Sequence, residues 1–246
     1  MTDTPAPDLK PSFRSDVTVD LVKHAASDSD VLWAARVSTA GEQSLEELQK
    51  DPERSKGLIN FLMRDRHGSP FEHNSMTFFI SAPIFVFREF MRHRVGWSYN
   101  EESGRYRELQ PVFYVPDADR KLVQQGRPGK YEFVDGSPEQ QELTARVMED
   151  SYRRSYEAYQ EMLAAGVARE VARATLPVGL FSSMYATCNA RSLMHFLGLR
   201  TQHELAKVPS FPQREIEMVG EKMEREWARL MPLTHAAFNT NGRVAP

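Results

Sequence analysis

The strongest constraint on the fold is one long amphipathic helix that the sequence predicts between Ser137 and Gly166. Its start carries three signals: a side-chain cap at Ser137, a proline at the next position, and an amide three residues after the cap at Gln140. Apolar residues then recur every three or four positions, as one face of a helix requires, at Leu143, Val147, Met148, Tyr152, Tyr156, Tyr159 and Leu163. Because such a stripe normally faces a core, we interpret it as a packing surface rather than a cofactor site.

Shorter patterns place strands early in the chain and helices late. Residues 17–22 alternate as a strand does, and residues 75–81 are rich in strand-forming side chains. Helices are predicted over residues 30–37, 52–65, 83–94 and 189–206, and a last helix, capped by Ser210 and Gln213, runs to residue 230. Since strands and helices do not alternate, we predict an α+β fold, in which a central, mostly antiparallel sheet is surrounded by helices.

Composition narrows the class of protein. With 246 residues, of which 41% are hydrophobic, the chain is long enough to bury a core within one domain. We expect residues 17–246 to form that single domain, and residues 1–16, which include three prolines, to form a flexible N-terminal arm. A formal net charge of -3 argues against a nucleic-acid partner.

Two further features bear on the compartment. The longest apolar stretch, residues 78–87, is about half the length of a membrane span, so we expect no membrane partner. The N-terminal residues lack an apolar signal core, and the single cysteine, Cys188, allows neither an intrachain disulfide nor a cysteine-based zinc cluster. The sequence therefore predicts a cytoplasmic protein without a metal.

Polar chemistry is concentrated between Arg88 and Glu108. This window holds five arginines, four glutamates, one histidine and no lysine. Guanidinium groups form planar pairs with phosphate or carboxylate and keep their charge, so the choice of arginine favours a small anionic ligand. A solvated face of arginine and glutamate pairs would explain the same composition. The interleaved Trp97, Tyr99 and Tyr106 favour the ligand, since aromatic rings beside arginines also suit a stacked base.

Residues 92–106, RHRVGWSYNEESGRY, resemble the signature of the flavin-dependent thymidylate synthases, in which RHR precedes a serine. Three further segments resemble parts of that family's pattern in the same order: HGSPFEH at 67–73, AREVARATLP at 168–177 and NARSLMHFLGLR at 189–200. The resemblance implies reductive methylation of dUMP to dTMP. It also implies 5,10-methylenetetrahydrofolate as carbon donor, FAD as bound redox carrier and NADPH as reductant.

The resemblance also implies roles for individual residues. It assigns FAD binding to Ser69, Arg92, His93, Arg94, Glu101, Asn189, Arg191 and His195, with His67 near the flavin. It assigns dUMP binding to Glu89, Phe90, Met91, Arg92, Glu102, Ser103, Gly104, Arg105, Arg173 and Arg200. Arg200 is the implied catalytic residue, because it matches the family's arginine that promotes ionisation of the uracil N3.

Several of these residues also have structural explanations. Ser69 and His67 would stabilise a turn, and cations at 92–94 and at Arg200 would complement the negative ends of helices. His67 and His73 flank a glutamate but lack the helical spacing of a zinc motif, so we assign no metal to them.

Arg191, His195 and Arg200 fall on one predicted helix. Arg191 and His195 share a face, whereas Arg200, nine residues after Arg191, lies on the opposite face. One straight helix cannot direct all three side chains into a single pocket. A site assembled from several chains removes the conflict, and the resemblance implies a homotetramer whose sites are shared between subunits.

Two other functions are weighed against this one. A conventional methyl-transferring enzyme would use Cys188 as a covalent nucleophile, although a thiol among apolar and small residues is typical of an inert core position. Ser103 is a second candidate nucleophile, but no arrangement of serine, histidine and acid is evident. A binding protein without turnover would keep the arginines, yet the full set of matching polar residues favours the enzyme. The sequence offers no motif for the folate site.

Overall fold

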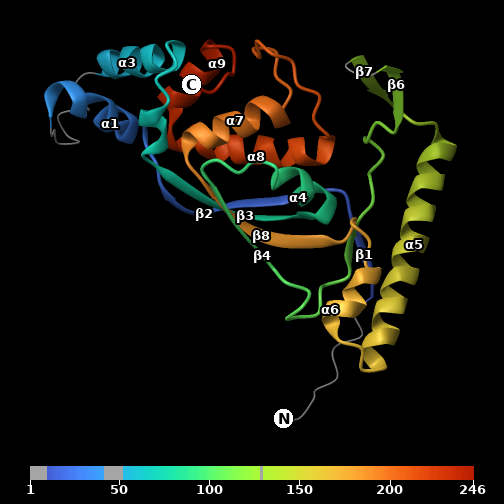
Figure 1. Cartoon of the computed structure of the whole chain (residues 1–246). Coiled ribbons are helices and arrows are strands. Elements are labelled where there is room, and N and C mark those ends of the chain that lie inside the picture. Colours follow the sequence, from blue (N-terminus) through green and yellow to red (C-terminus); the bar gives the residue numbers. More distant parts are fainter. Residues whose placement is uncertain (1–9, 42–51, 128–129) are drawn as a thin grey trace. The chain divides into compact units, whose positions relative to one another are not determined.

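A computed structural model describes residues 10–41, 52–127 and 130–246 (Figure 1). Its strands are β1 (Ser12–Arg14), β2 (Thr18–Ala25), β3 (Ser75–Pro83), β4 (Trp97–Glu101), β5 (Val112–Tyr114), β6 (Val123–Arg127), β7 (Lys130–Val134) and β8 (Phe181–Cys188). Its helices are α1 (Asp28–Ala40), α3 (Pro52–Arg64), α4 (Ile84–Phe90), α5 (Pro138–Ala164), α6 (Arg169–Ala172), α7 (Ala190–Arg200), α8 (Arg214–Leu230) and α9 (Pro232–Thr240). Short 3-10 helices are η1 (Ser69–Glu72) and η2 (Arg173–Thr175).

The chain divides into two compact units, which are described separately below. Unit 1 contains the described part of residues 1–16 together with Ser81–Arg88 and Glu101–Ser183. Unit 2 contains Val17–Ile80, Glu89–Asn100 and Met184–Pro246, as far as they are described. Strands β3, β4 and β8 each have residues in both units. None of the described helices is long and apolar enough to cross a membrane.

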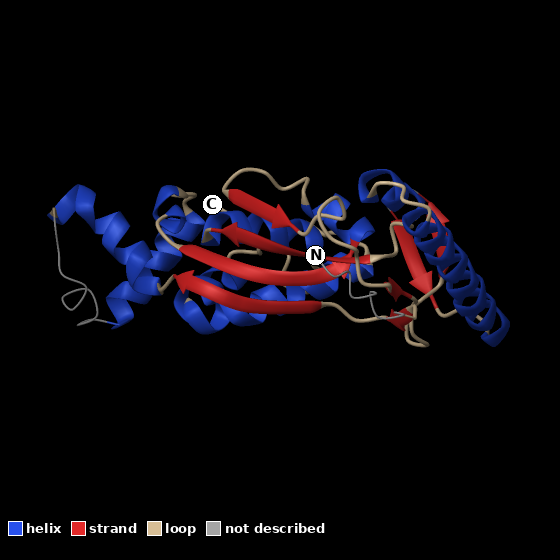
Figure 2. Cartoon of the chain, turned by 90° about the horizontal axis from the view of Figure 1, so that it is seen from below, coloured by secondary structure: helices blue, strands red, loops and turns tan. Residues whose placement is uncertain are grey.

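The largest sheet has four strands in the order β2-β3-β8-β4, and the arrows of neighbouring strands alternate in direction (Figure 2). This confirms the mixed helix and sheet fold with an antiparallel sheet. In unit 2, helices α7 and α8 lie on one side of this sheet (Figure 1). Side chains of β3 alternate accordingly: Met76, Phe78 and Ile80 are fully buried, whereas Thr77 and Phe79 are only partly covered.

The helix predicted from residue 137 onward is α5, and its capping signals are confirmed. The Ser137 hydroxyl accepts from the Gln140 N–H at 3.3 Å, and the Gln140 side chain accepts from the Ser137 N–H at 2.8 Å. Gly166, with φ of 82°, follows the helix as predicted. Two orphan donors are thereby satisfied at the start of the longest described helix.

The apolar stripe of α5 forms the core of unit 1 only in its later turns. Tyr152 is buried and stacks on Phe113 of β5, with ring centroids 4.9 Å apart. Leu143 and Val147, which the periodicity placed in the core, are instead 51% and 49% exposed. The first turns of the helix therefore extend beyond the strands that cover the later ones.

Helix α8 carries the predicted stripe of unit 2, but its start differs from the prediction. Four members of the stripe are fully buried: Ile216, Val219, Met223 and Trp227. The N-cap is Gln213, and no side-chain cap bond is formed there. The Ser210 hydroxyl donates instead to the Thr201 carbonyl, so the prediction that it caps α8 is wrong.

The predicted helix over residues 83–94 is wrong at both ends. Pro83 is the last residue of β3 and not the first of the helix. The N–H of the next residue, Ile84, still donates to the Leu180 carbonyl, at 2.9 Å. At the other end α4 stops at Phe90, and a turn follows in which the His93 N–H donates to the Phe90 carbonyl at 3.0 Å. The segment 92–94 therefore lies in a turn and not on the last turn of a helix.

The predicted helix over residues 189–206 is correct at its start and too long at its end. Asn189 is the N-cap of α7, and its side chain accepts from the Ser192 N–H. The helix stops at Arg200 because Thr201 is extended, with φ of -130° and ψ of 147°.

Several strands carried no signal strong enough to predict. Residues Ser12–Arg14, which the prolines placed in a flexible arm, form β1 and pair in parallel with β5. Strands β6 and β7 form an antiparallel hairpin, and β4 and β8 lie in the central sheet. These pairings join segments that are distant in the sequence or lack alternation, so local patterns do not reveal them.

The capping box of α5 gives a test of stability. Replacing Ser137 by alanine leaves the Gln140 N–H at the helix start without its acceptor, so Ser137→Ala should lower the free energy of unfolding by about 1 kcal/mol. Ser151→Ala is the matched control, because Ser151 is an exposed residue inside the same helix and alanine favours helix. Thermal melts should show a lower Tm for the first variant only; equal melting curves would contradict the cap.

Candidate active site

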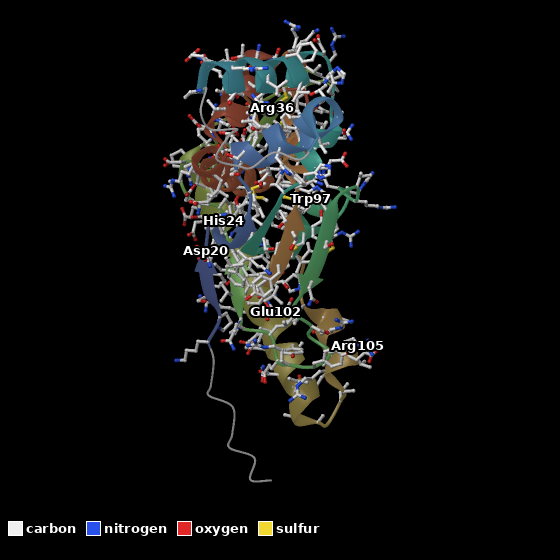
Figure 3. All side chains as sticks on the ribbon, turned by 90° about the vertical axis from the view of Figure 1, so that its left-hand side faces the viewer. Asp20, His24, Arg36, Trp97, Glu102 and Arg105 are labelled. Atoms are coloured by element: carbon white, nitrogen blue, oxygen red, sulfur yellow. The ribbon has the colours of Figure 1, made fainter. Side chains whose placement is uncertain are left out.

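In unit 1, the arginine-rich loop after β4 meets the 3-10 helix η2. Gly104 is buried, and a Cβ there would lie 3.0 Å from Leu109 Cδ1 and 3.3 Å from Arg173 Cδ. The stem of Arg173 therefore packs against a residue that has no side chain. The fold thus brings together two predicted dUMP residues, Gly104 and Arg173, from separate segments. Figure 3 shows Glu102 and Arg105 on the same loop.

Arg105 and Ser103 shape this loop. Arg105 Nε donates to Glu170 Oε2 of α6 at 3.2 Å, in a pair of which both side chains are about half exposed. The Ser103 hydroxyl accepts from the Arg105 N–H at 3.3 Å. All seven histidines of the chain lie within the residue ranges of unit 2, so unit 1 offers Ser103 no imidazole base. The exposed ion pair is weak, which leaves Arg105 able to turn towards an anion.

Two carboxylates stand at the start of the loop. Ser182 donates to Glu101 Oε1 at 2.7 Å. Burial raises the pKa of Glu101, the Ser182 hydrogen bond opposes this, and the neighbouring charge of Glu102 adds to it. The Glu102 N–H donates to the Ser183 carbonyl at 2.9 Å, so both glutamates fasten the loop to β8.

In unit 2, Arg200 at the end of α7 is held by the segment that follows β3. Its Nη1 donates to Glu89 Oε2 at 2.6 Å, and its Nη2 lies 3.5 Å from the Glu89 carbonyl. Its Nε donates to His93 Nε2 at 3.1 Å. Three of the five N–H groups of the guanidinium are thus engaged, and two are left for a ligand. These bonds lead away from the last carbonyls of α7, so Arg200 does more than cap its helix.

The histidines beside these arginines are neutral. Burial, together with the charges of Arg200 and His195, lowers the pKa of His93 from 6.5 to about 4. Its Nε2 accepts from Arg200, which assigns the ring proton to Nδ1. Burial also lowers the pKa of His195, and Arg191 and Arg66 add to the effect. Positive charge in this part of unit 2 therefore resides on arginine near neutral pH.

An aromatic cluster fixes the turn that carries His93. The ring of Phe90 is fully buried and contacts Phe196 and Trp97, at centroid distances of 4.5 and 5.2 Å. The Tyr99 hydroxyl donates to the His93 carbonyl at 2.6 Å. Trp97, labelled in Figure 3, and Tyr99 thus pack against their own core. Because the Phe90 side chain is inaccessible, only its backbone is available to a nucleotide.

At the other end of α7, Arg191 lies across Gly68. A Cβ on Gly68 would lie 2.6 Å from Arg191 Cζ and 2.8 Å from the Pro246 carbonyl oxygen, so the present position of Arg191 depends on glycine here. Arg191 Nε donates to the Pro246 carbonyl at 2.7 Å, and its Nη1 pairs with Glu72 of η1. Two predicted FAD-site segments, 67–73 and 189–200, therefore meet in unit 2.

The neighbours of Gly68 are open to solvent. Ser69 begins η1 with its side chain exposed, and His67 is exposed and stacks on Phe61, with centroids 5.6 Å apart. Both residues lie beside Gly68 in the sequence, and hence close to Arg191.

The turn at residues 92–96 rests on the start of α7. Ser192 donates to the Val95 carbonyl at 2.9 Å, while Asn189 accepts from the Ser192 N–H at the same distance. Gly96 has a φ of 70°, and a Cβ there would lie 2.1 Å from the Ser192 hydroxyl. Glycine is required at this position for both reasons. Asn189 thus has a structural function as a helix cap, besides its predicted contact with FAD.

Three of the predicted arginines are available to an anion. Arg92, Arg94 and Arg173 are exposed, and none forms an ion pair with any residue in the described ranges. Met91, which precedes this turn, is partly buried. Exposed guanidinium groups without carboxylate partners match the ligand class inferred from the arginine-rich window.

The candidate thiol is not accessible. Cys188 is 2% exposed at the end of β8, and burial raises the pKa of its thiol. A protonated, covered sulfur cannot attack a pyrimidine ring. The position has the properties of the inert core cysteine that its neighbours in the sequence suggest.

The carboxylates that hold Arg105 and Arg191 were not found from the sequence, whereas Glu89, the partner of Arg200, was a predicted site residue. Glu170 pairs with Arg105 across 65 positions, and Glu72 pairs with Arg191 across 119 positions. No local spacing links either pair, and only the proximity of Glu72 to the predicted Ser69 gave a signal.

Comparisons with known proteins identify a family. Residues 20–233 match the family described as Thymidylate synthase complementing protein. A protein of Streptomyces avermitilis named Flavin-dependent thymidylate synthase is 90% identical over 246 residues, which cover 100% of both chains. A protein of the same name from Tropheryma whipplei is 57% identical over 238 residues, or 97% of this chain and 98% of that one.

Solved structures are similar as well. The chain resembles a UMP/dUMP methylase, PolB, from Streptomyces cacaoi bound with 5-Br dUMP, with a TM-score of 0.89 and 56% identity over 95% of this chain and 99% of that one. The same protein bound with 5-Br UMP gives a TM-score of 0.88 and 54% identity, over 96% and 100% of the two chains.

The neutral state of His93 can be measured. Arg200→Gln removes a neighbouring positive charge, so it should raise the pKa of His93 above about 4, though not to 6.5, because burial remains. Arg191→Gln is the control and should raise the pKa of His195 instead. Titration of the ring resonances by NMR tests both shifts; a pKa of His93 near 6.5 in the unsubstituted protein would contradict the assignment.

The same shift has a consequence for stability. The unfolded chain takes up the His93 proton near pH 6.5, whereas the folded chain takes it up near pH 4. Lowering the pH from 6.5 to about 4 therefore lowers the free energy of unfolding. The contribution of the neutral His93 to that free energy is fully present only above pH 6.5.

Proposed function

The chain belongs to the family of flavin-dependent thymidylate synthases, and from that premise we propose that it methylates dUMP to dTMP with FAD, 5,10-methylenetetrahydrofolate and NADPH. The relatives of known structure were bound with 5-Br UMP and 5-Br dUMP, which supports a uridine nucleotide as substrate. The observation that carries the assignment is the packing of Arg173, which forms no ion pair with any described residue, against Gly104 of the signature loop.

The loop in unit 1 is the proposed phosphate site of dUMP. Gly104 has no side chain, so its backbone N–H can approach an anion closely. Arg173 supplies a guanidinium that pairs with no carboxylate in the described part of the chain, and Arg105 is released from its exposed pair with Glu170 when the nucleotide binds. Glu102 and Ser103 complete the proposed loop.

The cationic residues of unit 2 suit the other nucleotide, FAD. Arg92 and Arg94 are exposed and unpaired among the described residues, as binding of a pyrophosphate requires. We assign the remaining contacts in unit 2 to residues that lie near these arginines in the sequence, on η1, or at and after the N-cap of α7: Ser69, His93, Asn189, Arg191 and His195, with His67 nearby. The resemblance adds Glu101 of β4, which belongs to unit 1. When bound, FAD supplies the hydride chemistry that amino-acid side chains lack.

Arg200 is the proposed catalytic residue. Without a nucleophile on the uracil ring, the carbon to be methylated must become electron-rich by another route. A guanidinium beside N3 and a flanking carbonyl stabilises negative charge in the ring, and Arg200 has two N–H groups left for this. Glu89 and the neutral His93 fix its direction. Because His93 is uncharged, it accepts from Arg200 without repelling it.

Replacing Arg200 tests this function. The unsubstituted protein should bind FAD and form dTMP from dUMP when methylenetetrahydrofolate and NADPH are supplied, with UMP assayed in parallel. Arg200→Lys should keep FAD and its reduction by NADPH, while dTMP formation falls roughly a hundredfold, as expected for the loss of ~3 kcal/mol of transition-state stabilisation. Near-normal dTMP formation by this variant would show that Arg200 does not activate the pyrimidine.

Cys188→Ala is the matched control for the alternative with a covalent thiol. Since the thiol is buried and protonated, dTMP formation should stay close to normal in this variant. A loss of several orders of magnitude with FAD still bound would restore the thiol as nucleophile. A protein that binds FAD and dUMP but forms no product would instead be a binding protein.

We also propose that the protein works in the cytoplasm as a homotetramer with shared sites. Its one cysteine is buried and free, so it needs no oxidising compartment. On the sheet of unit 2, Tyr185 is 51% exposed and its ring meets that of Phe79 at 5.7 Å. An apolar surface of this kind suits contact with another subunit. Arg191 and Arg200, at opposite ends of α7, meet different partners, which supports pockets completed by other chains.

Mixing two inactive variants tests the shared sites. Arg105 lies in unit 1 and Arg200 in unit 2, so an Arg105→Gln chain and an Arg200→Gln chain carry different defects. If one pocket takes these residues from different subunits, mixed oligomers should recover part of the dTMP formation. Activity is measured after subunit exchange has been confirmed by native mass spectrometry. Absence of recovery in proven mixed oligomers would contradict shared sites.

A further inference from the structure

A buried ion pair, Arg243–Glu224, lies beside the end of α7. Arg243 has a side chain that is 1% exposed, and it donates to both carboxylate oxygens of Glu224 on α8, at 2.6 and 2.8 Å. It also donates to Asn239 at 2.7 Å and to the Thr201 hydroxyl at 3.1 Å. His235 contacts Glu224 at 2.9 Å.

Both carboxylate oxygens of Glu224 accept hydrogen bonds from cationic or imidazole groups within the cluster. Burial raises the pKa of Glu224, but hydrogen bonds and charge from Arg243 and His235 outweigh burial, and the pKa falls to about 2. Arg243 also has a φ of 55°, a left-handed conformation that is strained for a residue with a Cβ. A buried ion pair adds little net stability compared with apolar packing. What such a pair does provide is a fixed geometry for whatever it contacts.

The group that it contacts is the residue after Arg200. Thr201 is 4% exposed, and its hydroxyl donates to the Leu197 carbonyl at 2.7 Å while accepting from Arg243. The Thr201 carbonyl accepts from Ser210, and a Cβ on Gly220 would lie 2.7 Å from the Thr201 methyl. Thr201 is therefore held through its hydroxyl, its carbonyl and its methyl group.

Fixing Thr201 fixes the backbone from which the Arg200 side chain starts. The guanidinium is held from its far end by Glu89 and His93, so its position depends on both ends. Displacement of a catalytic group by about 1 Å can cost on the order of a hundredfold in rate. A small rotation at Thr201 would therefore misplace the two free N–H groups of Arg200.

We propose that Arg243, oriented by Glu224, is a positioning residue that sets Arg200 through the hydroxyl of Thr201. The inference rests on the proposed function, because it requires Arg200 to act on the pyrimidine. All the residues involved belong to unit 2, so each step is a contact within one compact unit.

Thr201→Val tests the link, because valine keeps the shape and removes the hydroxyl. This variant should retain FAD and NADPH oxidation but lose about tenfold in kcat for dTMP formation. Thr201→Ser keeps the hydroxyl and should stay within about twofold of normal. The decisive measurement compares the double variant Thr201→Val with Arg200→Lys against Arg200→Lys alone. Since the arginine that depends on Thr201 is absent from both enzymes, adding Thr201→Val should lower kcat for dTMP formation by less than about twofold.

Arg243→Lys is the second variant, with Arg229→Lys as control, since Arg229 lies on the surface with its side chain 72% exposed. Lysine lacks the fork that reaches Glu224 and Thr201 together, so only Arg243→Lys should lower kcat. If Thr201→Val lowers kcat by the same factor in the unsubstituted protein and in Arg200→Lys, its effect does not pass through Arg200 and the inference is overturned. A normal kcat for Thr201→Val would overturn it as well. If Arg200→Lys itself has no effect, the proposed function of Arg200 fails first, and the inference fails with it.

Discussion

A guanidinium group keeps its charge at any pH at which this protein folds, so each arginine that the fold covers must receive acceptors. In unit 2 the covered arginines meet carboxylates from distant segments, in the pairs Arg191–Glu72, Arg200–Glu89 and Arg243–Glu224. Because these carboxylates belong to η1, to the segment around α4 and to α8, the pairs tie both ends of α7 to its surroundings. The arginines left without partners in the described ranges are the ones free to bind an anion.

The histidines contribute by remaining neutral. Burial and neighbouring arginines lower the pKa of both His93 and His195, so neither carries a charge near pH 7. A protonated His93 would repel Arg200 and would lose the acceptor at Nε2 that now receives its N–H. The positive charge beside His93 and His195 is therefore carried by arginine. Below about pH 4 the His93 acceptor is lost, and Arg200 with it loses one of its supports.

Local signals in the sequence predicted some features of the helices correctly and others wrongly. The cap at Ser137 and the stripe of α8 depend on neighbours within a few residues, and both appear in the structure. The turn after α4 was predicted as helix. The helix ends at Phe90, whose ring is buried against Trp97 and Phe196, and contacts with such distant residues leave no local signal in the sequence. The resemblance identified the arginines, but their partners come from distant segments and no spacing reveals them. Thr201 was overlooked for the same reason.

Arg200 shows why the site uses arginine where lysine would supply the same charge. Its Nε and Nη1 point to two different acceptors, His93 and Glu89, and the rigid plane of the group then determines where the remaining N–H groups point. The ammonium group of lysine sits on a flexible side chain and has no such plane. If two of its N–H groups bound Glu89 and His93, the direction of the third N–H would still not be fixed. Cys188 is buried, and Ser103 has no histidine within unit 1 to act as its base. Under the proposed function, activation of the pyrimidine then depends on the direction of a fixed charge, and the contacts of Arg200 with Glu89 and His93 set that direction.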